Sequence, residues 1–331
     1  MKVLCYGVRD VEKPFFEKLN EKFGFELTLI PEYLNTKETA ELAKGHEVVI
    51  LRGNCFANKE NLDIYKKLGV KYVLTRTVGV NHIDIEYAKS LGFKLAYVPF
   101  YSPNAIAELA VTHAMMHVRN MAFTANVLSK KNFKCLPEMF SREIRNCTVG
   151  VIGLGKIGFT TAKLFKGLGA NVLGYDVIKK ENVQDILTQV DLDTLVKNSD
   201  IISLHIPYIK ENGQLVNETF LEKMKDNSIL INTGRGEVVN TKALINAIKS
   251  GKLAGAGLDT VENESKIFFK DFEGTVIPDE NFEELVKLYP KVTLSPHIGS
   301  FTDEAVTNMI ETSFENLKEY IETGECKNYI R

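Results

Sequence analysis

The sequence predicts an α/β protein that is built from two doubly wound parallel-sheet domains. Residues 1–98 repeat a short apolar strand followed by an amphipathic helix. Residues 148–176 place a glycine-rich turn between two further apolar strands, and strand and helix patterns alternate from there to residue 297. Alternating strands and helices with short loops are typical of parallel sheets. The length of 331 residues leaves room for two such domains.

The N-terminal part predicts one parallel sheet. Strands are expected at Lys2–Tyr6, Glu26–Ile30, Glu47–Leu51, Lys71–Thr75 and Lys94–Val98. Helices are expected near Pro14–Phe23, Lys37–Lys44, Lys59–Leu68 and Asp84–Leu91. Thr36 and Asn58 are predicted N-caps, and a glycine follows each helix where a left-handed conformation is cheap (Gly24, Gly45, Gly69 and Gly92). This part has no glycine-rich phosphate loop, so we expect no nucleotide site in it.

A long helix is predicted to begin near Pro103, within YSPNAIAELAVTHAMMHVRN. Its surface is apolar nearly all round, which predicts a helix buried between the two domains. We also expect residues 103–118 to form the interface of a homodimer. His113 and His117 lie four residues apart on this apolar helix, and we interpret them as core or interface residues rather than zinc ligands.

The stretch Thr148–Asp176 predicts a dinucleotide site. Gly153, Gly155 and Gly158 form G-x-G-x-x-G between the strand Thr148–Ile152 and a helix over Lys156–Leu168. Such glycines allow a tight turn, close approach of a pyrophosphate and close packing of helix on strand. Asp176 ends the next strand, Asn171–Tyr175, where it can accept hydrogen bonds from ribose hydroxyls. The acid favours NAD over NADP, although Lys179 and Lys180 follow it.

The rest of the chain continues the alternation. Strands are expected within residues 200–207, 228–236, 254–260 and 291–297, with helices near Asp193–Lys197, Asn217–Met224 and Thr241–Lys249. A final helix, Thr302–Ile321, is expected to return to the first domain. The predicted division is therefore 1–100 plus 299–331 for the catalytic (substrate) domain and 101–298 for the NAD-binding Rossmann domain. The cleft where they meet, near Tyr101 and His297, is the expected ligand site.

Composition excludes several classes of function. The net charge is −2 and charges of both signs are scattered, so nucleic acid and anionic membranes are not expected partners. No apolar run is long enough to span a bilayer. The N-terminus reads as a strand rather than a signal peptide. The five dispersed cysteines form no C-x-x-C and suggest reduced thiols, so we expect a cytoplasmic protein without a metal site.

Three polar residues are expected at or just after strand ends: Arg235, Glu264 and His297. Arg235 lies between two glycines, which suits a side chain that clamps a carboxylate, although pairing with a surface acid is the plainer reading. His297 is suited to donate a proton when a carbonyl carbon receives a hydride, and Glu264 could orient its imidazole. A capping role for His297 remains open on these residues alone.

Seven motifs in order then support a named resemblance: TRTVGVNHID, YSPNAIAELA, GVIGLGKIG, HIP, NTGRGEVVN, AGLDTVENES and SPHIGSFT. Along essentially its whole length the chain resembles the D-2-hydroxyacid dehydrogenases of the D-lactate dehydrogenase group. The resemblance implies a flavodoxin-like catalytic domain into which the Rossmann domain is inserted. It also implies that Arg235 clamps the substrate carboxylate, while His297, paired with Glu264, carries the proton.

The resemblance further implies which residues contact the cofactor and the substrate. NAD contacts are implied for Lys156, Ile157, Asp176, Ile206, Pro207, Asn212, Thr233, Gly234 and Asp259, besides the three glycines. The backbone of Val78 and Gly79 is implied to hold the substrate carboxylate, with Arg76 and Tyr101 nearby. Asn81 departs from the family, where Asp is common; we interpret this as a loop adjustment.

Arg52 suggests the substrate. It ends the strand in EVVILRGNC at a position expected to face the cleft, and a second cation suits a second carboxylate, as in 2-oxoglutarate. RGNCFANK also resembles the (R)-2-hydroxyglutarate dehydrogenases of the family. Pairing of Arg52 with a local acid is the plainer reading. The alternatives are a D-lactate, phenyllactate or 2-hydroxyisocaproate dehydrogenase or, from another class, an NAD-sensing corepressor-like protein.

Overall fold

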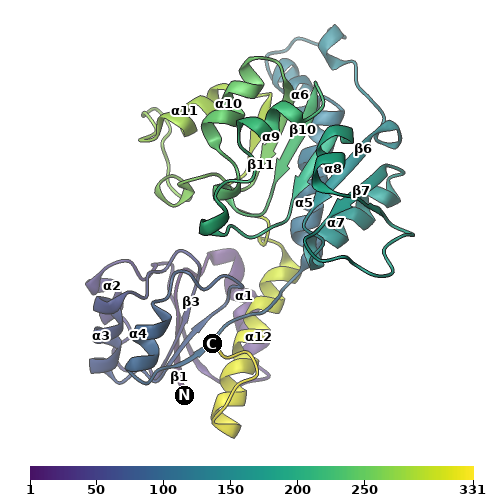
Figure 1. Cartoon of the computed structure of the whole chain (residues 1–331). Coiled ribbons are helices and arrows are strands. Elements are labelled where there is room, and N and C mark those ends of the chain that lie inside the picture. The colour runs from purple at the N-terminus through teal and green to yellow at the C-terminus, as the bar shows by residue number, and fades with distance from the viewer. The chain divides into compact units, whose positions relative to one another are not determined.

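The computed structural model describes residues 1–331 and divides into two compact units, each of which is described by itself (Figure 1). Unit 1 comprises Met1–Ser102 and Ser300–Arg331, and unit 2 comprises Pro103–Gly299. No helix is both long enough and apolar enough to cross a lipid bilayer.

Unit 1 contains a five-stranded parallel sheet in the order β2-β1-β3-β4-β5. The strands are β1 (Lys2–Cys5), β2 (Glu26–Leu29), β3 (Val48–Leu51), β4 (Tyr72–Thr75) and β5 (Lys94–Ala96). The helices are α1 (Lys13–Asn20), α2 (Lys37–Glu41), α3 (Lys59–Leu68), α4 (Ile85–Ser90) and α12 (Asp303–Thr323). This is the flavodoxin-like order, so the fold expected for this domain is confirmed.

Local signals explain where the helices of unit 1 begin and end. The side chains of Thr36 and Asn58 accept hydrogen bonds from Thr39 N and Asn61 N, as N-caps do. The helix predicted to reach Phe23 ends at Asn20, because the Asn20 side chain pairs with the backbone of Phe25 and closes the turn. The long C-terminal helix α12 packs against α1 and β4, which completes unit 1 from the far end of the chain.

Unit 2 contains a seven-stranded parallel sheet in the order β12-β11-β10-β9-β6-β7-β8. Its strands are β6 (Thr148–Ile152), β7 (Asn171–Tyr175), β8 (Thr188–Gln189), β9 (Ile201–Leu204), β10 (Ser228–Asn232), β11 (Leu253–Leu258) and β12 (Val292–Leu294). Its helices are α5 (Pro103–Val118), α6 (Met121–Ser129), α7 (Lys156–Gly167), α8 (Leu192–Asn198), α9 (Glu218–Lys223), α10 (Thr241–Lys249) and α11 (Glu280–Lys287). The strand order reverses at β6, as in Rossmann folds, so this expectation is also confirmed.

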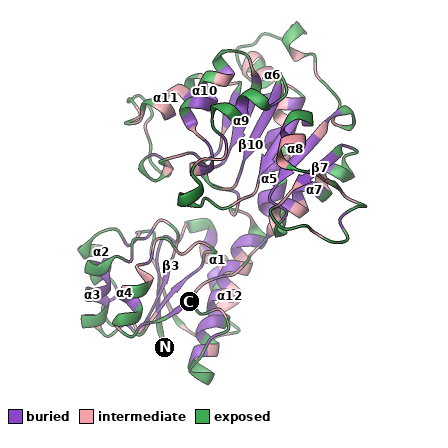
Figure 2. Ribbon diagram, viewed as in Figure 1, coloured by how far each residue is buried: buried purple, intermediate pink, exposed green.

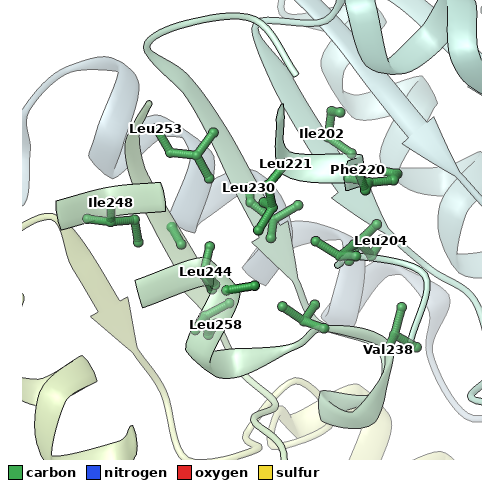
Figure 3. Packing of buried hydrophobic residues seen from close by; sticks show 14 of the residues in the cluster. Ile202, Leu204, Phe220, Leu221, Leu230, Val238, Leu244, Ile248, Leu253 and Leu258 are labelled. Carbon is green, nitrogen blue, oxygen red and sulfur yellow. The ribbon is translucent and has the colours of Figure 1, made fainter. Parts of the chain in front are cut away.

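The cores follow the sheets. In unit 2, Leu204, Leu230 and Leu258 from three neighbouring strands meet Leu221 of α9 and Leu244 of α10 (Figure 3). Each such fully buried aliphatic side chain stabilises the fold by about 1.5–3 kcal/mol. The strands are buried along most of their length, whereas the helices are exposed on their outer faces (Figure 2). Burial on both faces explains why the strands read as continuous apolar runs.

Several predicted strand ends were wrong by two to four residues. The strands expected to reach residues 207, 236, 260 and 297 end at Leu204, Asn232, Leu258 and Leu294. Beyond these points the apolar run gives way to Pro207, to the glycines around Arg235, to Asp259 and to Pro296, none of which extends a ladder. The residues that leave the sheet are the ones that form the loops described next.

Two helices were missed. Asn120, with φ of +49°, interrupts the helical run after α5, and α6 begins directly behind it. Apolar residues continue on both sides of Arg119 and Asn120, so the pattern predicts one helix and does not mark this break. α11 had a usable signal, because Asp279 caps Phe282 N and Phe282 and Leu285 are buried three residues apart.

Candidate active site

In the glycine-rich turn between β6 and α7, two of the three glycines leave no room for a side chain. Gly153 has φ of +91°, and a Cβ there would lie 2.5 Å from the carbonyl oxygen of His205. A Cβ at Gly158 would lie 1.8 Å from the carbonyl oxygen of Gly153. Gly155 instead caps α7 with nothing within 4 Å of an added Cβ. That open backbone, at the start of a twelve-residue helix, fits a pyrophosphate.

Asp176 follows β7, the neighbour of β6. Its carboxylate accepts hydrogen bonds from Leu154 N (2.8 Å) in the glycine turn and from Ile178 N (2.9 Å). Burial opposes ionisation, but these N–H groups and the Lys180 ammonium at 3.6 Å outweigh it and lower the pKa of Asp176. Val177 beside it is 86% exposed and offers an apolar surface. A fixed negative charge here suits ribose hydroxyls and repels a 2′-phosphate.

The loop after β10 also fits a dinucleotide. The hydroxyl of Thr233 is buried and has no hydrogen-bond partner within the chain. Asn232 closes the turn, because its side chain accepts from Gly234 N (3.1 Å) and donates to Arg235 O (2.9 Å). An unpartnered buried hydroxyl is costly unless a ligand pairs with it. Together with the open backbone at Gly155, it shows that unit 2 can accommodate the cofactor.

The other predicted cofactor residues described next follow the carboxyl ends of β6 and β9. Lys156 and Ile157 form the first turn of α7. Ile206 and Pro207 follow β9, and Asn212 lies exposed in the 3₁₀ turn Lys210–Asn212.

Arg235 stands between two glycines directly after β10. A Cβ at Gly236 would lie 2.2 Å from the carbonyl carbon of Val261, so this position excludes every side chain. The chain therefore runs close against the next loop, and the arginine side chain is left exposed. Its Nη1 donates only to Gly234 O (2.9 Å), and no acid pairs with it. Its other donors can therefore hold a carboxylate.

His297 and Glu264 form a hydrogen-bonded pair. Nδ1 of His297 lies 2.5 Å from Oε1 of Glu264, whose Oε2 accepts from Val261 N at 2.8 Å. Burial tends to lower the pKa of His297, and the charge of Arg235 does too. The hydrogen bond and charge of Glu264, assisted by Asp259, outweigh both and raise the pKa of His297 above its usual value. The imidazole is thus oriented by one nitrogen, while its Nε2 remains free to exchange a proton.

The backbone of His297 adopts a left-handed conformation with φ of +51°, which a non-glycine residue keeps only when its surroundings enforce it. Asp259 enforces it. The carbonyl of Asp259 accepts from His297 N (2.9 Å), and its carboxylate accepts from Ile298 N and Gly299 N (both 2.9 Å). Only 1% exposed, Asp259 holds the loop that presents the imidazole.

Three adjacent strands of unit 2 therefore carry the three predicted catalytic residues. Arg235 follows β10, Glu264 follows β11 and His297 follows β12, and these strands are neighbours in the sheet. The arrangement can bind a carboxylate and pass a proton to or from an adjacent oxygen.

In unit 1, Arg52 and Arg76 converge on one buried acid, Glu12. Arg76 is 1% exposed and reaches both oxygens of Glu12, at 3.3 and 3.2 Å. Arg52, at the end of β3, reaches Glu12 at 3.4 Å and Gly7 O at 3.3 Å, with 16% of its side chain exposed. The two guanidinium charges outweigh burial and lower the pKa of Glu12.

This cluster carries more positive than negative charge. Burial and the charge of Arg76 lower the pKa of Arg52 to about 10, against the opposing charge of Glu12. Arg52 therefore stays protonated at neutral pH. Two guanidinium groups share one carboxylate, which leaves a net positive charge at the end of β3. Arg76 serves as the inner partner of Glu12, and Arg52 is the member that solvent reaches.

The loop after β4 offers backbone donors. The N–H groups of Val78 and Gly79 donate no hydrogen bond within the chain. The turn is held instead by Thr77, whose hydroxyl donates to Gly79 O (2.6 Å). Adjacent free N–H groups at a strand end suit an anion. Tyr101 lies at the end of the first segment of unit 1, where its carbonyl accepts from Asn308 of α12 (2.6 Å).

A cavity of about 880 Å³ in unit 1 contains none of these residues. It lies between β5, α12 and the C-terminal segment. Of the residues just described, sequence reasoning missed Glu12 and the role of Asp259 in the His297 loop. No sequence signal marked Glu12, because its importance arises from two arginines that lie far away along the chain.

Comparisons with known proteins identify similar chains. Residues 111–299 match the family described as D-isomer specific 2-hydroxyacid dehydrogenase, NAD binding domain. An aromatic 2-oxoacid reductase of Clostridium sporogenes is 39% identical over 329 residues, covering 99% of this chain and 98% of its own. A D-lactate dehydrogenase of Lactiplantibacillus plantarum is 39% identical over 333 residues, covering 100% and 99%. The structure of D-lactate dehydrogenase with NAD⁺ from Lactobacillus jensenii superposes with a TM-score of 0.87 at 35% identity, covering 100% of both chains.

Proposed function

Since this chain belongs to the D-isomer specific 2-hydroxyacid dehydrogenase family of NAD-dependent oxidoreductases, we propose that its reaction is the reversible reduction of 2-oxoglutarate to (R)-2-hydroxyglutarate. The family, the enzyme class and the cofactor agree with the resemblance found in the sequence. The preference for 2-oxoglutarate and the role of each residue are the proposed part.

The residues of unit 2 would carry the chemistry. Arg235 binds the carboxylate next to the reacting carbonyl, because its guanidinium has donors to spare and no acidic partner. His297, protonated, donates a proton from Nε2 to the carbonyl oxygen during reduction and takes it back during oxidation. Glu264 stabilises the imidazolium through Nδ1. Bound NADH would supply the hydride, held at the glycine turn, Asp176 and Thr233.

The residues of unit 1 would recognise the substrate. The free N–H groups of Val78 and Gly79 suit the carboxylate beside the carbonyl. Arg52 suits a second carboxylate, because solvent reaches it and the cluster around Glu12 keeps an excess of positive charge. Pairing with a local acid, the plainer reading of Arg52, is present too. However, Glu12 is already engaged by Arg76 at both oxygens and can neutralise only one of the two cations.

The main support for this substrate is the excess of positive charge at Arg52, where two guanidinium groups share one carboxylate. A buried or half-buried cation without full compensation is costly, and an anionic ligand removes the cost. Monocarboxylate substrates, such as pyruvate or an aromatic 2-oxo acid, offer no group that would do so. A substrate with a second carboxylate does.

The proposal is tested by following NADH oxidation with a panel of 2-oxo acids. We expect the highest kcat/KM for 2-oxoglutarate, ahead of pyruvate, phenylpyruvate and 2-oxoisocaproate. A higher kcat/KM for a monocarboxylate would assign the chain to the D-lactate, phenyllactate or 2-hydroxyisocaproate group instead. No turnover of any substrate, with NADH binding intact, would favour the NAD-sensing corepressor-like alternative.

We further propose that the enzyme is a cytoplasmic homodimer, with the expected interface at residues 103–118 extended to the segment that follows them. Directly after α5, the segment 121–140 exposes a series of large apolar side chains: Met121, Leu128, Phe133 and Phe140. Phe140 is 90% exposed, which is costly unless another chain covers it. A molar mass of one chain in light scattering would contradict this. All five cysteines are unpaired, as is usual in a reducing compartment.

A further inference from the structure

Two histidines of α5 pack against the sheet of unit 2, His113 buried and His117 half-buried, and each faces a glycine of β11. A Cβ at Gly257 would lie 2.5 Å from Cβ of His113, and a Cβ at Gly255 would lie 2.8 Å from Nδ1 of His117. Because the histidines are four residues apart on one helix face, both reach across β11 toward β12. Gly257 is therefore required by the imidazole of His113, whereas an added Cβ at Gly255 would first meet the carbonyl oxygen of Lys291, at 2.5 Å.

The hydrogen bonds of His113 connect it to the loop that carries His297. His113 Nδ1 lies 2.9 Å from Oγ1 of Thr293, and its Nε2 lies 3.0 Å from Oγ of Ser295. The Ser295 hydroxyl in turn donates to Oδ1 of Asp259 at 2.6 Å. Asp259 is the residue that fixes the left-handed backbone of His297.

With His113 neutral, the hydrogen bonds in this series can run in only one direction. The Ser295 hydroxyl gives its hydrogen to Asp259, so it must accept from His113 Nε2–H. A neutral His113 then has a bare Nδ1, which accepts from the Thr293 hydroxyl. Thr293 accepts in turn from His117 Nε2–H (3.1 Å), which is also 3.0 Å from Ala256 O. The hydrogen on His117 Nε2 is shared between Thr293 and Ala256 O, and the series of hydrogen bonds ends on the Asp259 carboxylate.

This arrangement needs a neutral His113, because its Nδ1 accepts a hydrogen bond, whereas His117 can donate through Nε2–H in either protonation state. Burial lowers the pKa of His113, opposed by the charge of Asp259, and burial lowers the pKa of His117 to about 4. A leucine in either place would avoid the cost of burying an imidazole. The polar pair is therefore better explained by the hydrogen bonds that it makes than by packing.

We propose that His113 is a positioning residue for His297: through Ser295 and Asp259 it fixes the loop that holds the imidazole against Glu264. The inference rests on the proposed role of His297 as proton donor. His113 touches neither substrate nor cofactor; it orients the carboxylate of Asp259, on which the Ile298 and Gly299 N–H groups converge.

The test compares His113→Leu with His113→Gln. Gln keeps one amide donor for Ser295 and one acceptor for Thr293, whereas Leu keeps neither. The groups that act on the pKa of His297 are Glu264, Asp259 and Arg235. If the loop shifts and the contact with Glu264 loosens, this pKa falls, and the alkaline limb of kcat for reduction moves to lower pH.

For His113→Leu we expect kcat to fall about tenfold or more, and the alkaline limb to move down by about one pH unit, with NADH affinity little changed. His113→Gln should restore both. Ser295→Ala cuts the same link from the other side, so it should reproduce the His113→Leu profile, and the double variant should be no worse than either. If His113→Leu does not fold, Ser295→Ala carries the test.

His117→Leu is the matched control, because it removes a half-buried imidazole from the same helix face and leaves the link from His113 through Ser295 to Asp259 in place. It should lower the melting temperature but leave the alkaline limb in place. The inference is overturned if Ser295→Ala or a folded His113→Leu keeps the wild-type alkaline limb, or if His117→Leu shifts it equally. His297→Ala separates the two proposals, since full activity without His297 would refute the proton-donor role itself.

Discussion

At the scale of single residues, the proposed function depends on how far Glu264 raises the pKa of His297. The side chain of His297 is partly exposed, at 41%, and its remaining burial tends to lower its pKa. The 2.5 Å contact with Glu264 raises its pKa, so more of it stays protonated at neutral pH. In the proposed reaction, reduction needs this protonated form and oxidation needs the neutral one. We therefore expect the pair to set the pH range in which each direction runs.

Replacing Glu264 with Gln should show this directly. Gln can still contact Nδ1 but removes the negative charge, so the pKa of His297 should fall. Since only the imidazolium donates a proton, kcat for reduction should decline at a pH about one unit lower than in the wild type. The rate of oxidation at mildly acidic pH should be affected less, because the neutral imidazole is then favoured. An unchanged pH profile in both directions would contradict the pairing.

At the scale of elements, the glycine turn contains one glycine that the fold requires and another that cofactor binding is expected to require. Gly158 is required by the fold, since a Cβ there would overlap the carbonyl of Gly153. Gly155 has open space around it. Gly167, in the last turn of α7, also has nothing within 4 Å of an added Cβ and is far from the turn in sequence. These three positions allow a matched comparison.

Alanine at each of the three glycines should have a different effect. Gly155→Ala should keep the melting temperature and lose NADH affinity by about tenfold or more, because the methyl group occupies the approach of the pyrophosphate. Gly158→Ala should unfold or strongly destabilise unit 2. Gly167→Ala should stabilise it by about 0.5–1 kcal/mol and leave NADH binding unchanged. Thermal melts and NADH fluorescence titrations measure both properties, and wild-type affinity in Gly155→Ala would refute the phosphate site.

Element types were predictable from the sequence because their causes are local. Thr36 and Asn58 cap helices as expected, and the apolar runs in 148–152 and 171–175 form the expected strands. The strand ends near Arg235 and His297 were not predictable, because the polar residues there leave the ladder to make contacts with distant loops. Asp259 illustrates the limit. It was expected to contact NAD, yet its carboxylate accepts three hydrogen bonds from residues 295–299.

At the scale of the whole molecule, the candidate residues are divided between the two units. Unit 2 carries the glycine turn, Asp176 and the set Arg235, Glu264 and His297. Unit 1 carries the free N–H groups of the Val78–Gly79 loop and the cationic cluster around Glu12. The sequence predicted both sheets and both sets of candidate residues. It could not predict that Arg52 and Arg76 meet at one acid, because Glu12 lies 40 and 64 positions away from them along the chain.

Arg52→Ala tests whether Arg52 recognises a second carboxylate of the substrate. Measured with NADH, the variant should raise KM for 2-oxoglutarate by about tenfold or more, because a carboxylate loses its charged partner. KM for pyruvate should change little, and kcat should stay similar for both, since Arg52 takes no part in proton transfer. Arg52→Lys keeps the charge but not the planar guanidinium, so its KM for 2-oxoglutarate should lie between those of the wild type and Arg52→Ala. An equal change of KM for both substrates would show that Arg52 does not recognise a second carboxylate.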